Sequence, residues 1–171
     1  MDVSYQVKLV DTFVYDLTKA PTWNNMGEFE YTNMSDFKVD ATAFSPETQP
    51  TFVNYVEGIY VGYKFYETAA TEGLIDYDKT VQYPFGYGLS YSTFEQKIVN
   101  SSTEGDTVTL TVEVKNTGSV AGKDVVEVYY NPPYTNGGIE KSSANLVTYT
   151  KTGSIEPGAT QTVEVSFDKE D

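Results

Sequence analysis

Carboxylates are the side chains through which this sequence could carry out catalysis. The chain contains 25 Asp and Glu residues and neither histidine nor cysteine. The lack of both residue types excludes Ser-His-Asp and Cys-His catalytic sets, thiolate nucleophiles and disulfides, and it removes the usual zinc ligands. What remains is chemistry by paired carboxylates, a calcium or magnesium ion held by oxygen ligands, or a role without catalysis.

The spacing of the carboxylates does not predict a catalytic pair. Glu57 and Glu67 lie in a segment expected to be helical, about 15 Å apart along the axis at roughly 1.5 Å per residue. Asp76 and Asp78 could share one face of an extended segment, but nothing near them predicts the enclosed pocket that an acid catalyst needs. We therefore interpret these carboxylates as solvated or capping groups and predict no catalytic residue.

Candidates for binding are few. Trp23 could stack on a sugar ring, although packing in a core or between domains is the commoner role of a tryptophan. Asp36, Asp40 and Glu47 do not have the spacing of a calcium loop. We predict no metal site and no cofactor, and Trp23 is the one weak candidate for a substrate contact.

Length and charge limit the classes of function. The chain has 171 residues and a formal net charge of −14. The length suits one ordinary domain, or a small domain with part of another. The acidity disfavours binding to nucleic-acid phosphates or to anionic membranes. No apolar run approaches the roughly 20 residues that cross a bilayer, and the first residues do not resemble a signal peptide. Localisation stays open between cytoplasmic and secreted.

The first half of the sequence predicts few regular elements. Residues 12–15 alternate like a short edge strand, and residues 16–51 are irregular, with proline, asparagine and glycine at turn spacing. Residues 56–72 predict a helix that continues through Gly62, and Gly73 stands where a left-handed C-cap is expected. The apolar face of this helix would consist of Ile59, Tyr63, Tyr66 and Ala70.

A junction rich in aromatic residues and glycine separates this half from the next. It covers residues 83–94, where proline fixes one backbone angle and two glycines permit close approach or positive φ. Large aromatic side chains would hold such a connection in place by burying apolar area. We interpret it as the boundary between two domains.

The second half predicts β-structure. Residues 107–115 alternate without error, with the apolar side chains at even positions, and further strands are expected at 125–130, 146–150 and 162–167. From residue 95 onward we expect four or five strands, whereas an immunoglobulin-like sandwich has about seven. The fold class predicted is mainly β: an incomplete immunoglobulin-like sandwich, which we expect to be truncated.

Three blocks of the sequence resemble the C-terminal portion of the family 3 glycoside hydrolases, the β-glucosidase-like enzymes. Residues 55–67 resemble the last helix of the family's α/β sandwich domain, residues 83–94 its junction motif, and residues 112–129 the opening of its fibronectin type III-like domain. The resemblance implies that residues 1–92 are a helix-containing remnant, the C-terminal end of the α/β sandwich domain with the junction motif. It implies that residues 93–171 are a truncated fibronectin type III-like β-sandwich. The motif residues, to which we assign structural roles, are Glu57, Gly58, Gly62, Tyr63, Pro84, Phe85, Gly86, Gly88, Asn116, Gly118 and Gly122.

The resemblance implies a parent enzyme that hydrolyses β-linked glucosides or xylosides with retention, using two carboxylates roughly 5–5.5 Å apart. In the family these carboxylates lie on a barrel domain and on an earlier part of the α/β sandwich domain. No residue here matches either position, so we expect the chain alone to be inactive. Its partners would be the barrel and the rest of the α/β sandwich domain, and it would meet the β-glucoside only through them.

Two other functions remain open. A stand-alone carbohydrate-binding module would need an exposed aromatic platform, whereas the odd positions of the strands are mostly Thr and Glu. A protein-interaction module would show neither turnover nor sugar binding, but would gain stability from its partner. We favour a scaffold segment of the glycosidase.

Overall fold

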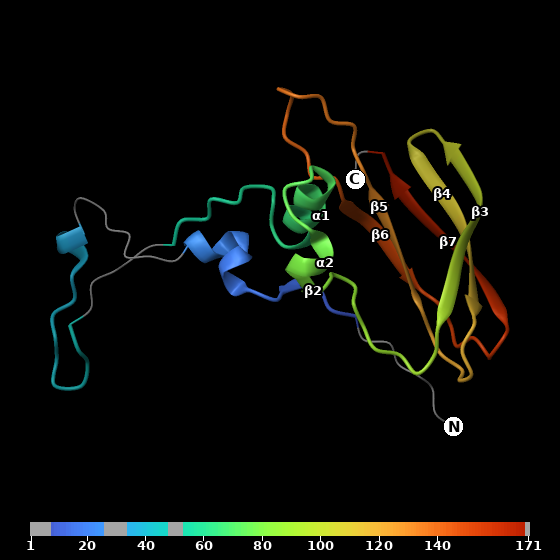
Figure 1. Ribbon diagram of the computed structural model, residues 1–171, viewed down its shortest axis with the longest axis horizontal. Coiled ribbons are helices and arrows are strands. Elements are labelled where there is room, and N and C mark those ends of the chain that lie inside the picture. The colour runs from blue at the N-terminus through green and yellow to red at the C-terminus, as the bar shows by residue number, and fades with distance from the viewer. Residues whose placement is uncertain (1–7, 26–33, 48–52, 170–171) are drawn as a thin grey trace.

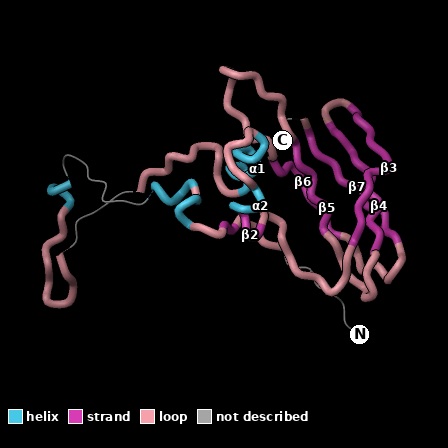
Figure 2. Tube along the Cα trace, viewed as in Figure 1, coloured by secondary structure: helices cyan, strands magenta, loops and turns pink. Residues whose placement is uncertain are grey.

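The computed structural model describes residues 8–25, 34–47 and 53–169 of the chain. In these residues the fold is mainly β, with strands in three small sheets and two short α-helices (Figures 1 and 2). A β-sandwich forms one end of the molecule, and a smaller unit that contains both helices lies beside it. The predicted fold class is confirmed.

The sandwich consists of two antiparallel sheets. One has the order β3-β4-β7 and the other pairs β5 with β6. The bounds of these strands are β3 Phe94–Glu104, β4 Thr107–Asn116, β5 Val125–Tyr130, β6 Asn145–Lys151 and β7 Thr160–Asp168. Each strand expected from alternation is present, to within two residues at its ends.

Alternation along the strands forms the core between the two sheets. The even residues of β4 point inward, and Val112 and Val114 meet Val165 of β7 and Val126 of β5. Ile155 completes this buried cluster. Burying each such side chain stabilises the fold by about 1.5–3 kcal/mol, which explains why a strict period of two specifies the sandwich.

The smaller unit is built around a second core. Strand β1 (Phe13–Val14) pairs with β2 (Val81–Tyr83), and Val14 and Val81 pack on Tyr66 of helix α1 (Tyr63–Thr71). Helix α2 (Tyr77–Thr80) leads directly into β2, and the Asp76 carboxylate caps it by accepting from the Lys79 N–H. The edge strand predicted at residues 12–15 is therefore confirmed.

In the described residues of the region predicted to be irregular, the structure has three 3₁₀ turns, η1 (Leu17–Lys19), η2 (Pro21–Asn25) and η3 (Met34–Phe37), and an isolated β-bridge between Thr42 and Ser45. Asp16 caps η1 by accepting a hydrogen bond from the Thr18 N–H at 3.0 Å. Residues 34–47 extend away from both cores, at the left of Figure 1. The described side chains of this arm, which begin at Ser35, are all exposed.

The predicted helix over residues 56–72 was wrong at its start. Helix α1 begins at Tyr63, because Gly62 has a φ of 57°, a conformation that does not continue a right-handed helix. Ile59 therefore lies in a turn and is exposed, outside the helical face assigned to it. The C-terminus agrees with expectation, since Gly73 has a φ of 71° and its N–H bonds to the Ala70 carbonyl.

Candidate functional site

Tyr63 joins the smaller unit to the sandwich. Its ring lies 4.7 Å from the ring of Phe85 in the junction and 5.9 Å from that of Tyr129 in β5, measured between centroids. Its hydroxyl accepts a hydrogen bond of 2.9 Å from the backbone N–H of Leu146 in β6. One side chain of α1 thus contacts the junction and both strands of the β5-β6 sheet.

A second contact reinforces this interface one helical turn further along α1. The Thr68 hydroxyl accepts a hydrogen bond of 2.9 Å from the Ser143 N–H, in the segment that precedes β6. It donates in turn to the Lys64 carbonyl at 2.6 Å. The helix is therefore fixed to the sandwich at two successive turns, which restricts rotation of one unit against the other.

The junction forms a tight turn that only glycine allows. The Tyr87 N–H bonds to the Pro84 carbonyl at 3.0 Å, and Gly86 between them has a φ of 77°. A Cβ on Gly86 would lie 2.9 Å from a carboxylate oxygen of Glu127 in β5. Glu127 also lies 3.6 Å from the ammonium of Lys8. The junction is thus pressed against the outer face of β5.

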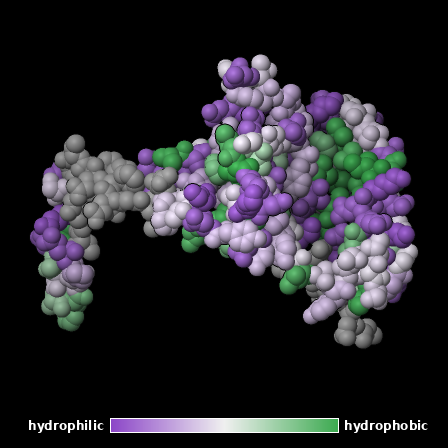
Figure 3. All heavy atoms as spheres, in the orientation of Figure 1, coloured by the Kyte–Doolittle hydropathy of each residue, from purple (hydrophilic) through white to green (hydrophobic). Residues whose placement is uncertain are grey.

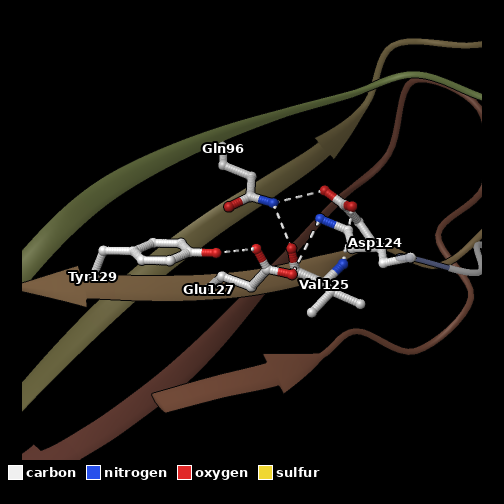
Figure 4. Close-up of polar contacts among 6 residues, drawn as sticks. Gln96, Asp124, Val125, Glu127 and Tyr129 are labelled. Carbon is white, nitrogen blue, oxygen red and sulfur yellow. Dashed lines mark hydrogen bonds and ion pairs between the residues drawn. The ribbon is translucent and has the colours of Figure 1, made fainter. Parts of the chain in front are cut away.

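Glu127 and Tyr129 interact on that same face. The Tyr129 hydroxyl donates to the Glu127 carboxylate at 3.0 Å (Figure 4). Burial raises the pKa of Tyr129, and the hydrogen bond to Glu127 raises it further. At neutral pH the tyrosine therefore stays protonated and donates to Glu127, and the pair is part of the interface.

Asn116 stabilises the corner where β4 ends. Its side chain is fully buried and makes four hydrogen bonds, donating to the carbonyls of Val120 and Ile155 at 2.8 Å and accepting from the Ser92 hydroxyl and the Gly118 N–H. An amide whose hydrogen bonds are all made costs little to bury. Removal of the Asn116 side chain would instead take a hydrogen bond from each of these partners.

Two motif glycines follow Asn116, and at Gly118 the absence of a side chain allows a close approach of two backbones. A Cβ on Gly118 would clash with Ser92 and would lie 2.7 Å from the Thr93 nitrogen, while the Gly118 N–H bonds to the Thr93 carbonyl. Gly122 exchanges two backbone hydrogen bonds with Ile155. Gly118 therefore holds the end of the junction against the sandwich, and Gly122 joins two segments within the sandwich.

The motif residues before α1 form a separate turn. The Tyr60 N–H bonds to the Glu57 carbonyl, and Gly58 within that turn has a φ of 57°. The Glu57 carboxylate accepts a hydrogen bond of 2.6 Å from the amide of Asn25, which is buried. Glu57 therefore connects this turn to η2. Gly88 is half-buried in the junction.

Two further carboxylates singled out in the sequence also have structural partners. Glu67 accepts a hydrogen bond of 2.7 Å from the Tyr77 hydroxyl, and Asp76 accepts from the Lys79 ammonium at 2.6 Å. Trp23 lies on η2 with 53 % of its surface exposed, so it is not a core residue of this chain. Within the described ranges, no group of acidic side chains has the arrangement of a metal site.

A cleft of about 550 Å³ lies between α1 and the segment that joins β5 to β6. Tyr60 and Glu72 line one wall, and Tyr134 and Lys141 line the other. Burial raises the pKa of Tyr60, and the nearby charge of Glu140 adds to the effect. The cleft is open to solvent and lies beside the Thr68 contact described above.

Sequence reasoning missed several residues of the interface. Tyr129 carried no signal beyond its place in an alternating strand, and the Leu146 N–H is a backbone group that no side-chain pattern reveals. Asn25 lies in an irregular segment. The two consecutive asparagines after Trp23 are typical of a cap or turn, and this is the signal that could have identified Asn25. These partners are separated along the chain, so only the fold brings them together.

Comparison with known proteins gives a consistent result. No protein-family model matches the chain. A β-glucosidase of Ruminococcus albus is 34 % identical over 170 residues, which are 99 % of this chain and 15 % of that protein.

In the described part of the chain, no helix is long and apolar enough to cross a membrane.

Solved structures agree with this relationship. β-Glucosidase 3B from Thermotoga neapolitana, in complex with glucose, superposes with a TM-score of 0.72 at 33 % identity, over 96 % of this chain and 19 % of that one. A β-glucosidase of glycoside hydrolase family 3 from Bifidobacterium adolescentis gives 0.70 at 28 % identity, over 98 % of this chain and 20 % of that one. The chain thus spans less than a quarter of the length of these relatives. It belongs to the family 3 glycoside hydrolases of the β-glucosidase type and corresponds to a C-terminal portion of such an enzyme.

Proposed function

We propose that this chain is the non-catalytic support of a β-glucosidase-type enzyme. It would hold the end of the α/β sandwich domain, residues 1–92, in a fixed position against the β-sandwich of residues 93–171. The parent enzyme would hydrolyse β-linked glucosides or xylosides with retention. The partners of the chain would be the catalytic barrel and the rest of the α/β sandwich domain.

The contact of Tyr63 with three distant segments carries this proposal. A support must resist movement between the parts it joins, and an aromatic side chain packed on two rings and hydrogen-bonded to a strand provides that stiffness. The carboxylates of the interface, such as Glu127, are used for hydrogen bonds and ion pairs. Retention would require a second carboxylate roughly 5–5.5 Å away, whereas the partners of Glu127 in these contacts are a tyrosine and a lysine.

The isolated chain tests the proposal against its alternatives. We expect no hydrolysis of aryl β-glucosides at any pH, and flat calorimetric traces when glucan oligosaccharides are titrated. Turnover that is lost with Glu67→Gln or Glu57→Gln would contradict the support role. Saturable heat that is lost with Trp23→Ala would favour a carbohydrate-binding module instead, with Phe37→Ala as the control for an exposed aromatic on the arm.

A further inference from the structure

The segment that joins β5 to β6 contains a tight turn at Asn136 and Gly137. The Gly138 N–H donates to the Thr135 carbonyl at 2.8 Å, and Gly137 has a φ of 82°. No described residue other than glycine has a positive φ, so the φ of Asn136 is negative. This combination defines a type II turn with glycine at its third position.

This turn is open to solvent. Its segment projects from the molecule at the top of Figure 1, and Figure 3 shows mainly hydrophilic side chains there. Residues 135–138 are all exposed, and a Cβ on Gly137 would meet no atom within 4 Å. In the described part of the chain, neither the Asn136 side chain nor the Gly137 N–H makes a hydrogen bond. Both groups are therefore available to react with each other.

An asparagine followed by glycine combines an electrophile and a nucleophile. The backbone nitrogen of Gly137, after losing its proton to hydroxide, forms a bond to the side-chain carbon Cγ of Asn136. The amide nitrogen of Asn136 leaves as ammonia, and a succinimide ring remains. Water then adds to one of the two ring carbonyls. The ring opens to aspartate, or to isoaspartate, in which the main chain runs through the side-chain carbon. These steps need no oxidant and no cofactor, and they make asparagine a thermolabile residue.

The residue that follows each asparagine decides where this reaction occurs. Asn136 is the one asparagine of the sequence that precedes glycine, which has no side chain to obstruct ring closure. Asn131 precedes Pro132, whose nitrogen has no proton to lose. Asn145 precedes Leu146, whose N–H already donates to the tyrosine hydroxyl on α1. Sequence and fold together therefore select Asn136.

We propose that Asn136 is a site of covalent modification, converted to aspartate and isoaspartate through a succinimide formed with Gly137. This inference goes beyond the support role and does not depend on it. Each product adds a negative charge to the segment that lines the cleft with Tyr134 and Lys141. Isoaspartate also lengthens the backbone by one carbon, so the hydrogen bond that closes the turn loses its geometry.

Ageing of the full chain tests this site. The chain is incubated in mildly alkaline buffer made with heavy-oxygen water, and a parallel sample is unfolded in guanidinium chloride. Cleavage after lysine releases residues 124–141, which contain both Asn131 and Asn136, and a sample cleaved without incubation gives the baseline for mass spectrometry. We expect aspartate and isoaspartate at residue 136, each with one heavy oxygen atom, and an unchanged Asn131. Because the turn opens at little cost, the folded chain should react within about tenfold of the rate in denaturant.

Variants distinguish ring closure from direct hydrolysis of the amide. Gly137→Ala should slow the reaction about tenfold or more, since a methyl group obstructs the attacking nitrogen. Gly158→Ala is the matched control, because Gly158 also lies in an exposed turn, with a φ of 76° and no atom within 4 Å of an added Cβ. It follows proline in the sequence, and its substitution should leave the rate at Asn136 unchanged.

Three outcomes would overturn the proposal. The first is an intact Asn136 in the folded chain after an incubation that converts it in denaturant. The second is aspartate without isoaspartate, which indicates direct hydrolysis of the amide. The third is an equal rate in the Gly137→Ala variant. These readouts concern one side chain, so they can fail while the support role stands.

Discussion

The ring of Tyr63 lies 4.7 Å from the ring of Phe85, with the two planes inclined at 42°. Tyr63 is the first residue of α1 in the smaller unit, and Phe85 belongs to the junction that enters the sandwich. Because Tyr63 also contacts β5 and β6, the two units of the chain are expected to unfold together.

Removal of this side chain tests that coupling. Tyr63→Ala should destabilise the chain by about 3–4 kcal/mol, since it deletes a packed aromatic ring. Tyr63→Phe should cost about 1 kcal/mol, because it removes only the acceptor of the Leu146 N–H. Urea unfolding, monitored by tryptophan fluorescence and by circular dichroism, measures the loss of stability in both variants. Tyr15→Ala, at an exposed tyrosine, is the control and should change little. Separate transitions in the unsubstituted chain would contradict the coupling.

The buried amide of Asn116 is the next point of weakness. Asn116→Ala should destabilise the sandwich by about 3 kcal/mol, because it removes the acceptor of the Ser92 hydroxyl and the donor to the part-buried Val120 carbonyl, and it takes one of two donors from the buried Ile155 carbonyl. Asn100→Ala, at an exposed asparagine of β3, should stay within about 0.5 kcal/mol. Thermal unfolding of the two variants makes the comparison, and equal midpoints would show that the corner is not important for stability.

Gly118 should not tolerate a side chain. Gly118→Ala places a Cβ 2.7 Å from the Thr93 nitrogen, so the junction must move, at a cost of about 2–3 kcal/mol. Gly105→Ala meets no atom within 4 Å and has a φ of 61°, so it should cost only the roughly 1 kcal/mol of backbone strain. A loss for Gly118→Ala no greater than that of Gly105→Ala in urea unfolding would argue against close contact at the junction.

The smaller unit should lose stability at high pH. Burial and then the hydrogen bond to Glu67 raise the pKa of Tyr77. Below the unfolded pKa of about 10 the phenol is neutral in both states, so the stabilisation is fully present. Above it the unfolded chain loses the proton while the folded chain retains it, and the free energy of unfolding falls as pH rises. In Tyr77→Phe the free energy of unfolding should decrease less steeply with pH between about pH 10 and 12, as measured by urea unfolding at each pH. An unchanged slope would show that Tyr77 titrates alike in both states.

The sequence predicted the strands far better than the interface. Val108, Leu110, Val112 and Val114 alternate because one face of their strand is buried, and that period is visible in any window of the sequence. The start of α1 was missed because the apolar spacing continued across Gly62 from Ile59 to Tyr63, and only the backbone conformation at Gly62 ends the helix. The partners of Tyr63 could not be predicted, since Phe85, Tyr129 and Leu146 are brought to it by packing.

Replacement of the matched segment of the Ruminococcus albus β-glucosidase by this chain tests the support role most directly. The measurement is kcat/KM for an aryl β-glucoside, with the fraction of folded enzyme determined in parallel. We expect the hybrid to be active, Glu57→Gln and Glu67→Gln to retain the pH profile of kcat/KM, and Tyr63→Ala to lower activity together with the folded fraction. A well-folded hybrid that loses kcat with one of these carboxylates would contradict the account, because the chain would then contribute to catalysis itself.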